Sequence, residues 1–139
     1  MSRCLSILVL LSLQGASARC QPVPPSPRRV VALDYPRFAR NAHLQGVVSL
    51  AVGVAADGSV SSVRILFGAS PLAEPARDVV RRWLFTVCAA GKKCEMNLTF
   101  SFRLIGSCSV GSYCPTTFQI DLPDHVSVIS TVPSGGPVY

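Results

Sequence analysis

The feature that most constrains the fold of this chain is a strict alternation of apolar and polar side chains from Met96 to Leu104. Every second residue of this run is large and apolar, and the residues between them are polar. A period of two residues is that of a β-strand that buries one face and exposes the other. The run therefore predicts a half-buried strand, and the rest of the fold must supply a core for its apolar face.

A hairpin is predicted upstream of this strand. Residues 47–54 also have a period of two, with large aliphatic residues on one face and mostly small residues on the other, and residues 59–67 form a second apolar-rich run. Between them stands Asp57-Gly58, a pair that favours a tight hairpin turn because both turn positions require positive φ. Val60 is out of phase with the other apolar residues of the return strand, which a bulge or a late start of pairing would explain.

Two helices are expected to cover the apolar strand faces. A short one opens at Tyr35-Pro36, because proline suits the first helical turn. A second has Ser70 as its N-cap and runs to Trp83 with apolar residues at helical spacing. On its outer face, Asp78 and Arg82 are spaced to pair. We therefore expect an α+β fold: a small antiparallel sheet of about three core strands with two helices packed on one face, plus a disulfide-stapled C-terminal extension.

The composition indicates one packed domain. The chain has 139 residues, of which 49% are hydrophobic and 14% charged, and this balance excludes a disordered chain. Four parts are predicted: a signal peptide (1–18), a proline-rich linker (19–29), a folded domain (30–105), and an extension (106–139) that forms a hairpin or lid and ends in a frayed tail.

The N-terminus has the pattern of an export signal. A short basic region, residues 1–3, precedes an apolar segment, residues 4–13, and a small-x-small cleavage site at residues 16–18. We expect cleavage after this site and export of the mature chain. Lipid anchoring through Cys20 is the disfavoured alternative, because Arg19 stands where a bacterial lipoprotein signal has a small residue.

Four cysteines form two pairs of equal spacing, Cys88 with Cys94 and Cys108 with Cys114. In an oxidising compartment, paired cysteines indicate disulfide bonds. Sequence alone cannot choose among their connectivities, and we favour local pairing within each loop. A zinc site is the competing interpretation, but structural zinc usually separates paired ligands by only about two to four residues.

No motif in the sequence indicates catalysis, a cofactor or a metal. Neither His43 nor His125 has a carboxylate or nucleophile motif beside it. The net charge is +6, but the basic residues lack the interleaved aromatic residues typical of a nucleic-acid reader. We therefore expect neither an enzyme nor a protein that binds nucleic acid or a small-molecule substrate.

Several segments, taken in order, resemble the C-terminal domain of TonB-family proteins. They are YPRFAR at 35–40, LQGVV at 44–48, ADGSV at 56–60, the second helix with its ending RWLF at 82–85, and FSFRL at 100–104. The resemblance implies a periplasmic module that binds an extended segment of an outer-membrane transport protein or another envelope protein. It also implies a part in TonB-dependent transmembrane transport.

The resemblance further implies the mode of binding. An extended peptide pairs with the exposed edge of the last strand, and main-chain hydrogen bonds supply the affinity. The partner-binding residues implied are Leu33, Asp34, Tyr35, Pro36, Asn97, Thr99, Phe100, Ser101, Phe102 and Arg103.

A second interpretation of the same sequence stays open. Residues 118–122 could fold back and pair with the closing strand, which would cover the edge that a ligand would use. The alternative is then a secreted, disulfide-stabilised structural or binding protein whose sheet edge is closed by its own tail and which takes no part in energy transduction. Homodimerisation through an exposed edge also stays open.

Overall fold

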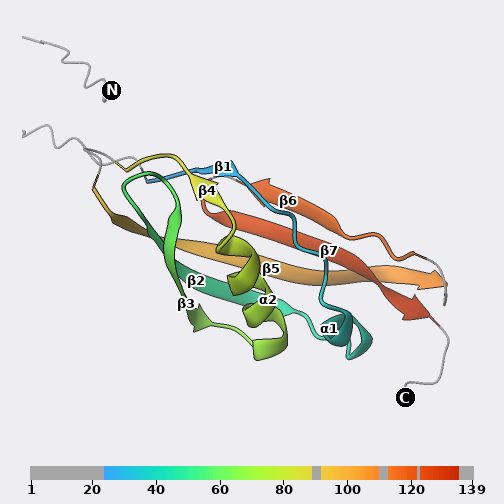
Figure 1. The fold of residues 1–139 in the computed structure, drawn as a ribbon. Coiled ribbons are helices and arrows are strands. Elements are labelled where there is room, and N and C mark those ends of the chain that lie inside the picture. Colours follow the sequence, from blue (N-terminus) through green and yellow to red (C-terminus); the bar gives the residue numbers. More distant parts are fainter. Residues whose placement is uncertain (1–23, 89–91, 110–112, 122, 135–139) are drawn as a thin grey trace, which may run out of the picture.

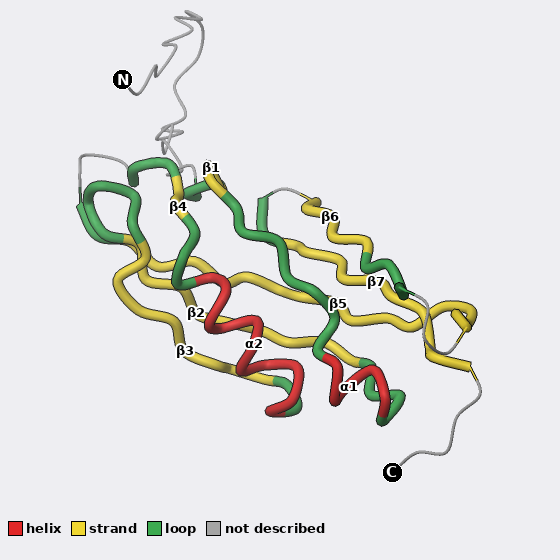
Figure 2. Tube along the Cα trace, turned by 45° about the vertical axis from the view of Figure 1, so that its right-hand side comes forward, coloured by secondary structure: helices red, strands yellow, loops and turns green. Residues whose placement is uncertain are grey.

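The computed structural model describes residues 24–88, 92–109, 113–121 and 123–134. The elements are β1 (Pro27–Arg29), α1 (Arg37–Asn41), β2 (Gly46–Val54), β3 (Val60–Phe67), α2 (Ser70–Val80), β4 (Leu84–Phe85), β5 (Cys94–Ser109), β6 (Thr117–Asp121) and β7 (His125–Ser134). Five strands form one sheet in the order β3-β2-β5-β7-β6, and β1 pairs with β4 in a separate two-stranded sheet. Both helices lie on one face of the five-stranded sheet (Figures 1 and 2).

The predicted hairpin is confirmed, together with its irregularity. β2 and β3 pair in antiparallel fashion, and the register shifts between Gly53 and Val54, where Val54 opposes Val60. This shift is a β-bulge, which returns the side chains of β3 to the phase of the sheet. The half-buried Val63 and Ile65 then oppose the buried Val52 and Leu50 across the hairpin.

The hairpin turn depends on two adjacent residues. The Asp57 carboxylate accepts hydrogen bonds from the hydroxyl and the backbone N–H of Ser59, at 2.6 and 2.9 Å, and these bonds lower the pKa of Asp57. Gly58 has a φ of +90°, and a Cβ at this position would lie 2.2 Å from the carbonyl oxygen of Phe85. Glycine is therefore required both by the backbone conformation and by the close approach of β4.

The sheet is larger than the expected three core strands, and it is not purely antiparallel. β5 pairs in antiparallel fashion with β2 but runs parallel to β7. After β5 the chain returns as β6, one strand position away, and the turn at Pro123-Asp124 sends β7 into the gap between them. β7 brings the fully buried Val126 and Val128 into the core, so the C-terminal extension is part of the sheet.

α2 begins and ends slightly differently from the prediction. Its N-cap is Ala69, and Ser70 is the first helical residue. The helix ends at Val80, and the chain then tightens into a turn in which the Trp83 N–H donates to the Val80 carbonyl at 3.0 Å. Of the helices in the described part of the chain, none has the length and apolar composition needed to cross a membrane.

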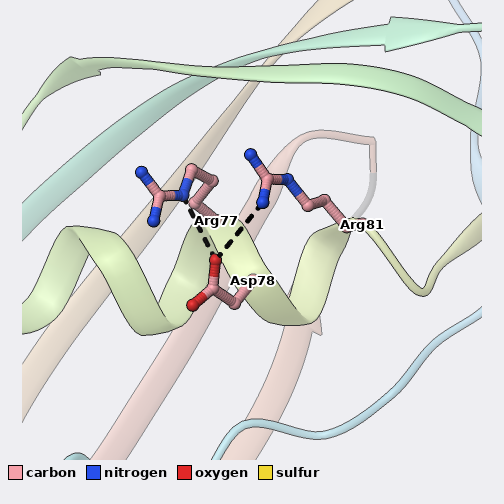
Figure 3. Close-up of polar contacts among 3 residues, drawn as sticks. All are labelled: Arg77, Asp78 and Arg81. Carbon is pink, nitrogen blue, oxygen red and sulfur yellow. Dashed lines mark hydrogen bonds and ion pairs between the residues drawn. The ribbon is translucent and has the colours of Figure 1, made fainter.

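On the outer face of α2, the ion pairs also differ from the prediction. The Asp78 carboxylate pairs with Arg77 at 3.2 Å and with Arg81 at 3.7 Å, rather than with Arg82 (Figure 3). The helix ends before Arg82, so the regular four-residue spacing does not carry that side chain over Asp78. All three groups of the observed pairs are largely or partly exposed, so the pairs contribute little to stability.

Trp83 lies at the centre of the core. It is 1% exposed, and its indole N–H donates to the Val31 carbonyl at 3.0 Å. Its ring contacts Phe85 of β4, Phe100 of β5 and Phe118 of β6, with ring centroids 6.0 to 6.3 Å apart. The Trp83 side chain thus joins β4 of the two-stranded sheet, β5 of the five-stranded sheet and β6 of the C-terminal extension.

Candidate protein-binding site

The edge expected to receive a partner strand is that of β5. On one side, β5 pairs with β2 from Cys94 to Phe102. On the other side, β7 pairs with it from Thr99 to Leu104 and again from Ser107 to Ser109. The main-chain groups that a peptide would use are therefore engaged with the chain's own strand from Thr99 onward. Among the described residues, β7 does not pair with residues 94–98 of β5, and its pairing is interrupted at residues 105–106, where the register shifts.

The strand that covers the edge is not the predicted one. Residues 118–122 were the expected cover, but Phe118–Asp121 belong to β6 at the outside of the sheet, and β7 lies between β6 and β5. Leu122 lies outside the described residues. β7 carries fully buried valines, whereas the apolar residues of β6 are only half-buried. The strand with the more deeply buried apolar side chains is thus the one with a neighbour on both sides.

β7 is tied to β5 by packing as well as by backbone pairing. Val126 and Val128 are fully buried, and Ser130 is only 2% exposed. At the start of the pairing, the Thr99 N–H donates to the carbonyl of Asp124 at 2.8 Å. β7 therefore behaves as a core strand rather than as a loosely attached lid.

The predicted β5 residues lie on two faces of the sheet. Phe100 and Phe102 point into the core, and they are 0% and 1% exposed. The other four lie on the face away from the helices: Asn97 and Arg103 are exposed, and Thr99 and Ser101 are half-buried. Only this polar face of β5 presents side chains that a partner could contact.

The predicted binding residues of the segment 33–36 include one that contacts β5, namely Tyr35. Tyr35 is 3% exposed, and its ring meets that of Phe102 edge-on with centroids 5.6 Å apart. Its hydroxyl donates to the Leu44 carbonyl, and burial raises the pKa of Tyr35. Its backbone N–H donates to the Thr116 hydroxyl at 3.3 Å. Tyr35 is thus a structural residue that joins this segment to the C-terminal extension.

Beside Tyr35, a cleft of about 460 Å³ opens between the start of α1 and the segment that precedes β6. Its walls are formed by Asp34, Tyr35, Pro36, Arg37, Arg40, Tyr113, Cys114 and Thr116. Arg40 spans the two walls, since its Nη1 lies 3.4 Å from the Cys114 carbonyl oxygen. The cleft brings the predicted binding residues Asp34, Tyr35 and Pro36 together with residues about 80 positions later in the chain, and no sequence pattern had connected the two groups.

The predicted disulfide pairing is confirmed. Cys88 bonds to Cys94, and Cys108 bonds to Cys114, so each bridge closes its own loop. The second bridge joins the end of β5 to the segment that forms one wall of the cleft. Cys20 and the expected signal peptide lie outside the described residues.

The two histidines lie in different parts of the fold. His43 is exposed beside α1 with a φ of 54°, whereas His125 begins β7 and its Nε2 lies 3.1 Å from the Ser101 hydroxyl. Within the described ranges, no three His, Cys, Asp or Glu side chains are grouped as a metal site would require.

The sequence model of one protein family matches residues 31–104, and its description is the C-terminal domain of the Gram-negative bacterial TonB protein. The chain belongs to this family. The matched residues run from the segment before Tyr35 to Leu104 in the middle of β5, in agreement with the resemblance described above. No curated protein sequence matches the chain.

Membership of the TonB C-terminal family suggests a periplasmic or envelope location and protein partners in the envelope. The match ends before the second disulfide, β6 and β7. The strand that closes the β5 edge and one wall of the cleft therefore lie outside the matched residues. A signal for β7 was present in the alternation of Val126 and Val128, but nothing in that pattern named β5 as its neighbour.

Proposed function

We propose that this chain is a periplasmic protein-interaction domain, associated with TonB-dependent transport, which binds an envelope protein while its β5 edge stays closed by its own strand β7. The family membership supports a protein-binding role in the envelope. The observation that carries the closed edge is the pairing of β7 with β5 in the place where strand addition would put a partner.

The energetics of β7 favour a closed edge. Burial of one valine contributes about 1.5–3 kcal/mol, and each backbone hydrogen bond contributes a further 0.5–1.5 kcal/mol or so. With two buried valines and the ladder along β5, displacement of β7 costs on the order of 10 kcal/mol before a new strand repays any of it. A partner that binds without displacing β7 avoids this cost.

A second candidate function is strand addition to β5 after β7 has been displaced. Its support is the stretch Cys94–Leu98, which has no strand on that side in the described part of the chain and could start such an exchange. The two candidates differ in one respect that can be tested, namely whether β7 must leave β5 for a partner to bind.

The test is a chain in which β7 is locked to β5 by a disulfide between Ser101→Cys and Ser127→Cys. These residues are direct neighbours in the parallel register, and adjacent strands lie about 4.8 Å apart, within the range that a disulfide spans. Each single cysteine variant serves as a matched control. Native and locked chains carry a photo-crosslinking residue at one of four exposed positions: Phe38, Val87, Asn97 and Tyr113.

We expect the native and the locked chain to crosslink to the same envelope protein in the periplasm. Loss of this product in the locked chain, with its retention in both single variants, would establish strand displacement instead. Absence of any envelope protein among the products from all four positions would contradict an interaction domain altogether.

A further inference from the structure

The cleft beside Tyr35 is positively charged. Arg37 and Arg40 are three residues apart on α1, so their side chains leave the helix on the same side. Both line the cleft, and within the described residues neither makes an ion pair, although Asp34 lines it too. Figure 1 shows α1, which carries both arginines, at the end of the sheet where β5 and β7 finish.

Arg40 has an unused hydrogen-bond donor. Its Nε is buried and has no hydrogen-bond partner among the described residues, and its Nη1 makes only a long contact of 3.4 Å with the Cys114 carbonyl oxygen there. Buried donors in proteins are nearly always paired, and an unpaired one costs free energy. An acceptor brought by a ligand would satisfy it, and a carboxylate does so best because it can accept two N–H groups of a guanidinium at once.

The remaining wall suits a protein segment rather than a small free anion. Tyr113 is 83% exposed, so its ring makes little contact with its own chain. Together with Pro36 it gives the cleft an apolar surface beside the two arginines. Exposed tyrosine and arginine are the residues that most often carry the binding energy of protein interfaces.

We propose that this cleft binds an acidic segment of a partner protein, with carboxylates held by Arg37 and Arg40 and an adjoining side chain packed on Tyr113. The proposal rests on the proposed function, because it names the surface that binds while β7 closes β5. One wall comes from residues beyond the family match, so the site is a property of this chain's extension.

The probe is a fluorescein-labelled octapeptide of alternating Glu and Gly, compared by fluorescence anisotropy with the same peptide carrying Gln in place of Glu. We expect the full chain to bind the acidic peptide at least about tenfold more tightly, with an affinity that falls as salt rises. Arg37→Glu should weaken binding by about tenfold or more, and Tyr113→Ser by about fivefold. Both side chains are exposed, so neither change disturbs the core.

Arg28→Glu is the matched control, because it makes the same change in charge at an exposed residue of β1, away from the cleft. It should alter binding by less than about twofold, the residual effect of net charge. Equal binding of the two peptides, or an equal loss in Arg28→Glu and Arg37→Glu, would overturn the proposal.

Vesicles of phosphatidylglycerol and inorganic phosphate provide the other arms. The proposal is wrong, and the cleft is a phosphate or lipid site, if two results occur together. The vesicles or the phosphate must displace the acidic peptide from the native chain, and they must bind more tightly than the peptide does, with the same dependence on Arg37. Failure of peptide binding together with successful crosslinking to an envelope protein would overturn this inference but leave the proposed function standing.

Discussion

The sharpest prediction concerns Val128, because it asks whether β7 is a structural strand or a removable cover. Val128 is fully buried on the helix side of the sheet. Val128→Ala removes two methyl groups, which costs about 1.6 kcal/mol in transfer free energy at 0.8 kcal/mol per group. The cavity left behind adds about 24 cal/mol for each Å³ that the neighbours do not refill. We therefore expect the free energy of unfolding to fall by about 2 to 3 kcal/mol.

The assay is urea unfolding of the oxidised protein, followed by the fluorescence of Trp83. Two variants calibrate it: Val52→Ala, at a fully buried position of β2, and Val47→Ala, at a position that is 45% exposed. Val128→Ala should match Val52→Ala, and Val47→Ala should cost less than about 1 kcal/mol. If Val128→Ala behaves like Val47→Ala while Val52→Ala is destabilised by the full amount, β7 does not belong to the core, and the argument for a closed edge is wrong.

Two further predictions concern the turn between β2 and β3. Gly58→Ala should lower the free energy of unfolding by more than about 3 kcal/mol, because the new Cβ meets the Phe85 carbonyl. Gly106→Ala is the control: this residue also has a positive φ but open space around it, so the change should cost only about 1–2 kcal/mol. Equal costs of the two changes in thermal or urea unfolding would show that the contact with Phe85 is not the cause. The second change is Asp57→Asn. The pKa of Asp57 is lowered by hydrogen bonds from Ser59, so its stabilising contribution is complete above the unfolded value of 3.8 and is lost as pH falls through the lower folded value. The native chain should therefore lose more stability than Asp57→Asn between about pH 6 and pH 3 in urea unfolding, and parallel losses would refute this role of the carboxylate.

Much of the family-like part of the fold could be predicted from the sequence. The alternation of Met96–Leu104 and the turn at Asp57-Gly58 are local signals, and each corresponds to a strand or turn in the structure. The two disulfides have the local pairing that we favoured, although the sequence alone did not choose among the connectivities. These features depend on residues close together in the chain, so local sequence patterns indicate them.

The parallel pairing of β7 with β5 could not be predicted in the same way. Alternation at Val126 and Val128 shows which face of a strand is buried, but it does not show which strand lies beside it. The cleft could not be predicted from the sequence either, because Arg40 and Cys114 meet only after the extension has folded back. The β7–β5 pairing and the cleft, which both involve residues beyond the family match, are thus made by contacts between residues far apart in sequence.

The order of the strands along the chain has a consequence for folding during synthesis. β7 (His125–Ser134) follows β2, β3 and β5 in the sequence, so these three strands are made before the strand that completes their sheet. During that interval, the β5 edge of every newly made chain is unpaired, and at high concentration the β7 strand of one copy can pair with the β5 edge of another. Rapid or crowded expression should therefore yield interlocked dimers built from correctly folded halves, and slow expression should yield single molecules.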